Sequence, residues 1–231
     1  FLRARSTKLQ AANDAELAEG ARTRGWSFAT DHTPSRLVHK YGGSAGGVEW
    51  TAKSAADRRT SRSRGAWANR TLWNGAAPPL RDQVVEIWPA RGAGIQTGIQ
   101  LSPDNPLVRM LFGPLTEALG VDESRTAELL NVQEWNSGGA LEQHFSVRAT
   151  DPATAERLLN DEARAALVAY GAWTAQSDSA RHGGGLILAL YWDQGLTILT
   201  HWTDLEGLAR VTDVGSTLCK AAKDRLSAAG A

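Results

Sequence analysis

The chain has 231 residues, of which 42% are hydrophobic and 22% are charged, a composition typical of a folded globular protein. Basic and acidic residues number 25 each, so the formal net charge is zero and no overall field attracts a polyanion. The single Cys excludes an intrachain disulfide framework and a cysteine-based zinc site.

Charge is distributed unevenly along the chain. Residues 1–75 contain 13 basic and 6 acidic side chains, whereas residues 76–231 contain 12 basic and 19 acidic ones. This dipolar layout favours a location of the first third near an anionic surface. A solvated face with local counter-charges is the alternative interpretation.

The N-terminal segment reads as a helix rich in Ala, Leu and Glu, and Gly25 is a natural stop after it. Basic residues at its start, Arg3, Arg5 and Lys8, are typical of the cytoplasmic flank of a membrane span. We therefore expect residues 1–24 to form a juxtamembrane-like helix at the cytoplasmic face of a membrane. A chain without an anchor would have the same pattern.

The next part of the chain shows strand alternation. Trp26 and Phe28 alternate with polar neighbours, and so do Val48 and Trp50. The glycine-rich stretch 41–47 is predicted to end the second strand. Four or five short strands with turn-rich gaps indicate an antiparallel meander.

The C-terminal part has clear boundaries. Alternation predicts a strand over 145–149, and Asp151 followed by Pro predicts a helix start. Another helix is predicted over 161–170, followed by a hairpin over 186–202. Asp204 is predicted to cap a long final helix with one apolar stripe.

Together these elements predict one α+β domain over residues 25–231. Its antiparallel sheet is built in two stretches, helices pack on one side, and the long C-terminal helix closes the core. A division into two lobes near residues 90–106, where three Gly and two Pro occur, is the alternative.

Several segments carry a family resemblance. They are Leu-Ala-Glu at 17–19, Arg-Gly-Trp-Ser-Phe at 24–28, Gly-Val-Glu-Trp at 47–50, His-Phe-Ser-Val-Arg-Ala-Thr-Asp-Pro at 144–152 and Arg-Leu-Leu at 157–159. With the terminal hairpin and helix, they resemble an uncharacterised bacterial family, common in high-GC genomes, whose members often have one N-terminal transmembrane anchor. The resemblance implies an anchor before Phe1 and transfers no catalytic residue.

The chain shows no motif for metal or cofactor binding. The five histidines are His32, His39, His144, His182 and His201. None of them forms a His-x-x-x-His motif or pairs with a carboxylate at a sequence spacing typical of metal ligands, and His144 is predicted on the polar face of a strand. The glycine-rich stretch 91–98 lacks the following helix that a nucleotide-binding loop needs. Cys219 is predicted to be a buried apolar residue. We therefore expect no metal, no cofactor and no catalytic residue.

A basic segment is the strongest functional candidate. It combines four arginines with three hydroxyl side chains, and one more arginine follows shortly after; the predicted anion- or partner-binding residues are Arg58, Arg59, Arg62, Arg64 and Arg70. The expected partner is an anionic membrane surface or an acidic protein. A solvated hairpin tip is the alternative. Nucleic acid is not expected, because the pI is near 7.2.

These observations favour a membrane-tethered, non-catalytic binding or scaffold domain. One alternative is an enzyme or small-ligand carrier with a Trp-lined pocket that includes His144 or His201. A second alternative is a nucleic-acid binder that uses the Arg58–Arg64 segment and neighbouring tryptophans.

Overall fold

The structure is a computed structural model, and it describes most of the chain. The described residues are 2–32, 36–57, 69–80, 82–90, 129, 131–136, 138–177, 185–202 and 204–228. The possible lobe division at 90–106 therefore lies almost entirely outside the described residues.

A nine-stranded sheet forms the centre of the molecule, and every described strand pair is antiparallel. From one edge to the other, the strands are β1 (Ser27–His32), β2 (Arg36–Ala45), β3 (Val48–Asp57), β4 (Asn69–Gly75), β9 (Gly195–Thr200), β8 (Leu186–Trp192), β5 (Val85–Pro89), β7 (Phe145–Ala149) and β6 (Gln133–Trp135). The pairing of β4 with β9 joins the two predicted stretches into this one sheet.

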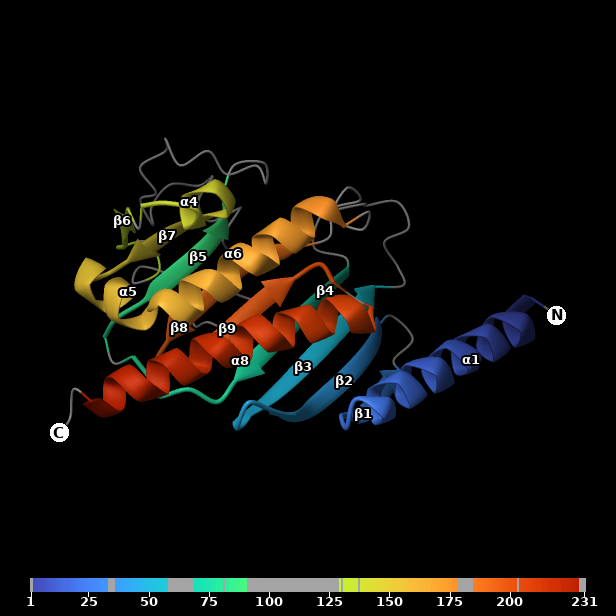
Figure 1. The fold of residues 1–231 in the computed structure, drawn as a ribbon. Coiled ribbons are helices and arrows are strands. Elements are labelled where there is room, and N and C mark those ends of the chain that lie inside the picture. The colour runs from blue at the N-terminus through green and yellow to red at the C-terminus, as the bar shows by residue number, and fades with distance from the viewer. Residues whose placement is uncertain are drawn as a thin grey trace.

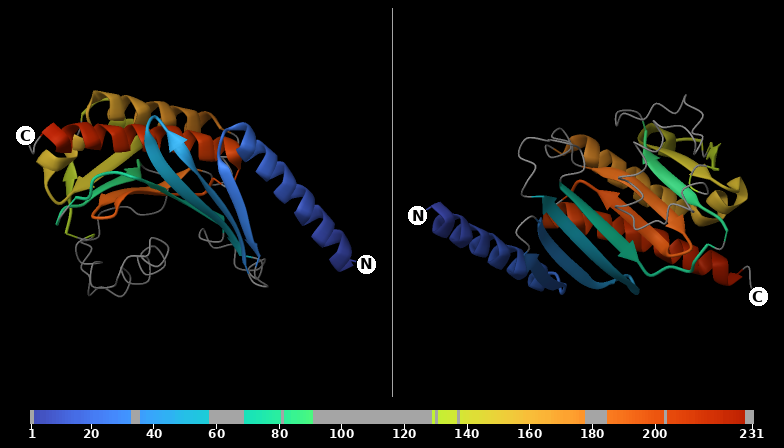
Figure 2. Two further views of the ribbon diagram at one scale, coloured as in Figure 1. Left: turned by 90° about the horizontal axis from the view of Figure 1, so that it is seen from below. Right: turned by 180° about the vertical axis from the view of Figure 1, so that it is seen from behind.

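The two longest helices that pack on the sheet lie on the same face of it. They are α6 (Asp161–Gln176) and α8 (Leu205–Ala228), which run side by side across the strands, while the short helices α4 (Leu141–His144) and α5 (Pro152–Leu158) lie near β7 (Figure 1). Seen from below, the sheet has α6 and α8 on one side only (Figure 2). The predicted fold class, with helices on one side and a long final helix, is confirmed.

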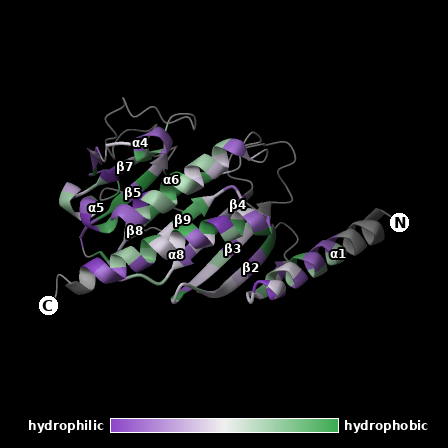
Figure 3. Ribbon diagram, in the orientation of Figure 1, coloured by the Kyte–Doolittle hydropathy of each residue, from purple (hydrophilic) through white to green (hydrophobic). Residues whose placement is uncertain are grey.

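The final helix closes the core through one apolar stripe. Leu208, Val211, Leu218 and Ala222 are all buried against the sheet layer, at 4% exposure or less. Hydrophobic colour is concentrated in the central strands, whereas α8 alternates between hydrophobic and hydrophilic residues (Figure 3). Cys219 is buried as predicted, and burial raises the pKa of its thiol to about 12.

The first helix, α1 (Leu2–Thr23), ends where the sequence predicts. The amide of Trp26 donates to the carbonyl of Ala21 at 2.9 Å, and the amide of Gly25 donates to the carbonyl of Arg22 at 3.0 Å. Gly25 has φ +72°, the left-handed conformation that this helix-ending motif requires. The turn reverses the chain into β1.

The sequence predicts that the glycine-rich stretch 41–47 ends the second strand. In the structure it does not. Strand β2 continues through Gly42 and Gly43, and the turn falls at residues 46–47. A Cβ on Gly43 would lie 3.2 Å from Cδ1 of Trp26 and 3.4 Å from Cζ2 of Trp50. The missing side chain leaves room for these two rings, which pack edge to face at 5.1 Å. The glycine therefore serves ring packing rather than a turn.

The predicted helix starts after β7 and β9 are confirmed. The side chain of Asp151 accepts a hydrogen bond from the amide of Ala153 at 3.0 Å, and Pro152 occupies the first helical position. Likewise, Asp204 Oδ1 accepts from the amide of Gly207 at 2.7 Å. His144, however, is the last residue of α4 rather than a strand residue.

Candidate functional site

The N-terminal half of α1 extends beyond the sheet. Asp14 is the point of attachment, because its Oδ1 lies 3.0 Å from Nε2 of His39 on β2. The twelve residues of α1 before Asp14 span about 18 Å at 1.5 Å per residue. In two views this part of α1 is clear of the sheet (Figures 1 and 2). It carries Arg3, Arg5 and Lys8 without an acidic residue.

Four strands reach the same end of the sheet. A single line of paired residues crosses them, from His32 on β1 through Leu37 and Ala56 to Asn69 on β4. After the turn at Gly25, β1 runs antiparallel to α1, back toward the N-terminal half of that helix. The end of the sheet where β1 ends is therefore the end beside which α1 projects. We call the end lined by these four residues, together with the projecting half of α1, the basic end.

The predicted arginine segment connects to the sheet at the basic end. Strand β3 ends there at Asp57, and β4 begins there at Asn69. The predicted residues Arg58, Arg59, Arg62 and Arg64 fall between these two positions and lie outside the described residues. Arg70, the fifth predicted residue, is the second residue of β4, is half-buried and pairs in register with Ala55.

The junction of α1 with β2 contains an acid, an imidazole and a phenol. The side chains of His39 and Asp14 are only 10% and 17% exposed. Burial, with a smaller contribution from the charge of Asp14, raises the pKa of Tyr41 to about 12. The Asp14–His39 pair is not apparent from the sequence, because 25 residues separate its members and only the docking of α1 on β2 brings them together. The pair holds α1 against the sheet.

A second polar cluster lies on the sheet face opposite the helices. Glu86 of β5 is 1% exposed, accepts a 2.9 Å hydrogen bond from Nε1 of Trp88, and lies 3.7 Å from the guanidinium of Arg148. Burial raises the pKa of Glu86 to about 7, although the Trp88 hydrogen bond and the Arg148 charge oppose this effect. Its cross-strand neighbour on β8 is Leu190, which is fully buried.

The buried position of Glu86 was also not predicted from the sequence. The run Val84, Val85, Ile87 and Trp88 predicts a strand that is apolar on both faces. This pattern does not account for Glu86, the acidic residue in the middle of the run. A single carboxylate within such a run was the available signal, because a buried carboxylate needs a partner. Arg148, its partner, lies 62 residues further along the sequence.

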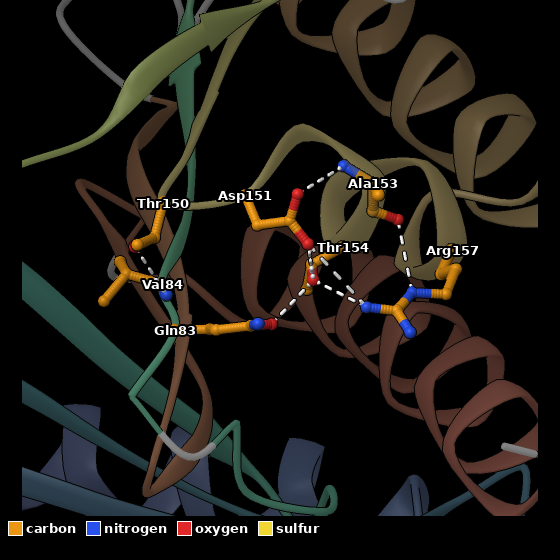
Figure 4. A network of polar contacts seen from close by, with 7 residues as sticks. All are labelled: Gln83, Val84, Thr150, Asp151, Ala153, Thr154 and Arg157. Atoms are coloured by element: carbon orange, nitrogen blue, oxygen red, sulfur yellow. Dashed lines mark hydrogen bonds and ion pairs between the residues drawn. The ribbon is translucent and has the colours of Figure 1, made fainter.

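The start of α5 holds a dense polar network that fixes a helix terminus (Figure 4). The hydroxyl of Thr154 accepts from Nη2 of Arg157 at 2.8 Å and lies 2.6 Å from Oε1 of Gln83 and 3.0 Å from Oδ2 of Asp151. Next to it, the amide of Val84 donates to Thr150 at 3.1 Å. The network ties α5 to the segment before β5, so its role is structural.

The other histidines that the structure describes do not assemble into a site. The ring of His144 packs against Gly171 of α6, and His201 follows β9. His32 ends β1, and His182 lies outside the described residues. Within the parts of the chain that the structure describes, no group of three or more His, Cys, Asp or Glu side chains is placed to hold a metal ion. None of the described helices combines the length and hydropathy needed to cross a membrane.

The site and fold define an α+β protein with a one-sided helical layer and a basic end. No family model, no curated protein and no solved structure matches this chain.

Proposed function

We propose that the chain is a non-catalytic binding domain that meets an anionic membrane surface, at its cytoplasmic face, through the basic end. The observation that carries the proposal is that the projecting half of α1 lies at the end of the sheet where β3 ends at Asp57 and β4 begins at Asn69, the residues that flank the basic Arg58–Arg64 segment in the sequence. A membrane anchor before Phe1, which the family resemblance implies, would place this end against the bilayer.

Electrostatics support this orientation. A basic residue near an anionic leaflet contributes about 1 kcal/mol, so a few engaged side chains already produce measurable attraction. The chain offers seven in the two segments: Arg3, Arg5, Lys8, Arg58, Arg59, Arg62 and Arg64. The acidic excess of residues 76–231 opposes a close approach by the rest of the domain. The uneven charge distribution therefore favours one orientation of this neutral molecule at an anionic membrane, with the basic end toward the bilayer.

The geometry of α1 also supports a tethering role. Its last turn is fixed by the helix-ending motif and by Ala21, which is fully buried, and the Asp14–His39 pair adds a second attachment. A helix that is fixed at one half and projects with the other transmits the position of whatever precedes it to the sheet. We propose that α1 sets the distance and direction between the membrane and the domain.

Binding to vesicles tests the proposal. The R58A/R59A/R62A/R64A variant and the R3A/R5A/K8A variant are each compared with the unaltered chain on phosphatidylcholine vesicles with and without phosphatidylserine. We expect binding that requires phosphatidylserine, at least a ten-fold loss in each variant, and strong weakening between about 50 mM and about 200 mM salt.

A matched control separates position from total charge. The variant K220A/K223A/R225A removes three positive charges near the C-terminal end of α8, away from the basic end. It should bind vesicles as the unaltered chain does. Equal, negligible binding by all proteins would reject the lipid proposal. An acidic protein captured through the same arginines, without vesicle binding, would instead make a protein the partner.

A further inference from the structure

Among the residues that the structure describes, the layer between α8 and strands β2, β3 and β4 contains five buried polar atoms without a hydrogen-bond partner. None of their residues is more than 7% exposed. Two are indole nitrogens and three are hydroxyl oxygens: Trp50 Nε1, Trp73 Nε1, Tyr41 Oη, Thr212 Oγ1 and Ser216 Oγ. All five groups are uncharged in the neutral pH range, and burial keeps the phenol of Tyr41 protonated.

Strand register brings the three aromatic residues together. Tyr41, Ala52 and Trp73 are neighbours in one line across β2, β3 and β4. Trp50 precedes Ala52 by two residues, so its side chain lies on the same face of β3. Its ring leans toward β2, since Cε2 and Cζ2 are the atoms that a Cβ on Gly43 would meet. The small side chain of Ala52 is thus surrounded by three polar aromatic rings.

The helix supplies the two remaining hydroxyl groups. Gly215 of α8 faces the ring of Trp73, and Leu205 of α8 contacts Gly20 of α1. At about 100° per residue, Thr212 and Ser216 lie about 60° and 100° from Gly215, on the side of Leu205. They are one turn apart and both are buried, so they point toward the β2 and β3 side of the layer.

Five buried polar groups without partners would carry a large cost in folding free energy. A buried donor or acceptor without a partner lowers the folding equilibrium constant by roughly ten-fold or more. Five would lower it about 10⁵-fold, which is comparable with the whole equilibrium constant of about 10³ to 10⁸ for small domains. More than about 90% of buried polar groups in folded proteins are paired.

We infer that this layer binds a small uncharged molecule that both donates and accepts hydrogen bonds. The five unpartnered groups are neutral, and a charged molecule would be buried there without a counter-ion. Asp14, the carboxylate whose charge reaches Tyr41, is already paired with His39. Water molecules and a small alcohol share this chemistry. The inference does not depend on the proposed membrane binding.

The sign of two hydroxyl deletions tests the inference. Thr212→Val and Ser216→Ala remove the hydroxyls with little change of shape. If a guest pairs with them, each variant leaves the guest underbonded, and the folding equilibrium constant should fall about three- to ten-fold in denaturant titrations. If the hydroxyls have no partner, each variant removes an unpaired group and the protein becomes more stable. Equal or higher stability of both variants overturns the inference.

A control and a second measurement sharpen the result. Thr217→Val changes a neighbouring residue of α8 whose hydroxyl donates to the carbonyl of Asp213 at 3.0 Å, so it reports the combined effect of Val in this helix and of losing one local hydrogen bond. Magnetic relaxation dispersion of the unaltered chain detects long-lived buried water, and mass spectrometry of the unfolded chain detects a released alcohol. Either signal, lost in the double variant T212V/S216A, identifies the guest.

Discussion

Glu86 on β5 and Arg148 on β7 face each other across the sheet, with 3.7 Å between Oε2 and Nη1. The carboxylate side chain is 2% exposed and the guanidinium side chain 15%. The contact is too long to offset the cost of burying the carboxylate charge, and the pKa of Glu86 is raised to about 7. Protonation of Glu86 is therefore linked to the stability of the sheet.

Glu86 should make stability depend on pH. Because its folded pKa lies above the usual value of 4.5, its stabilising contribution is complete below about pH 4.5 and is lost as pH rises to about 7. Glu86→Gln removes this loss. The variant should match the unaltered chain near pH 4.5 and exceed it at pH 8 by up to roughly 3 kcal/mol in unfolding free energy. Denaturant titrations at both pH values measure this, and a pH-independent difference would contradict it.

Asp14 should hold α1 against the sheet. Asp14→Ala removes the 3.0 Å contact with His39, so amide hydrogen exchange should become faster in residues 10–21. Glu19→Ala is the matched control on the same helix, since the Glu19–Arg22 pair is 62% and 75% exposed and contributes little. Unchanged protection in the Asp14 variant would show that the helix-ending motif alone positions α1.

Tyr170 should stabilise the contact between α6 and the start of α8. Its hydroxyl accepts a 2.8 Å hydrogen bond from Nε1 of Trp202, whose ring also packs on Trp173 at 4.8 Å. Tyr170→Phe leaves the buried indole N–H without this acceptor and should cost about 1–3 kcal/mol of unfolding free energy. Chemical denaturation measures the cost. A difference near zero would mean that the indole finds another acceptor.

The start of α5 offers a capping test. Asp151→Ala removes the acceptor for the amide of Ala153 and should lower the unfolding free energy by about 1 kcal/mol. Asp151→Asn keeps a capping oxygen and replaces Oδ2, which lies 3.9 Å from Arg157 and 3.0 Å from the Thr154 hydroxyl, with an amide nitrogen. Because the ion pair is exposed and the amide can still donate to the hydroxyl, this variant should stay close to the unaltered chain. Equal losses in both variants would make the contacts of Oδ2 with Thr154 and Arg157, rather than the cap, the stabilising ones.

Local patterns explain how much of the fold was predictable. Gly25, Asp151 and Asp204 act through hydrogen bonds to residues within five positions, so their sequence signals are complete in themselves. The apolar stripe of the final helix likewise repeats at helical spacing. These features predicted the element types, the one-sided helical layer and the long final helix.

The features that were missed depend on residues far apart in sequence. Gly43 looks like a turn residue until the rings of Trp26 and Trp50 are placed around it. The partners of His39 and Glu86 lie 25 and 62 residues away in the sequence, and their contacts exist only after α1 docks and β5 pairs with β7. The basic end could be predicted only in part. Its arginines are visible in the sequence, but its position beside α1 follows from the strand order.

The central claim, that the basic end faces an anionic membrane, is tested most directly by depth-dependent quenching. A fluorophore is placed on Asn13→Cys, an exposed position of α1, or on Gln194→Cys in the exposed β8–β9 turn at the other end of the sheet. Cys219 is fully buried, so labelling is confined to the introduced thiol. With spin-labelled lipids in anionic vesicles, we predict strong quenching at position 13 and little at position 194. Equal quenching at the two positions, or stronger quenching at 194, would contradict the claim.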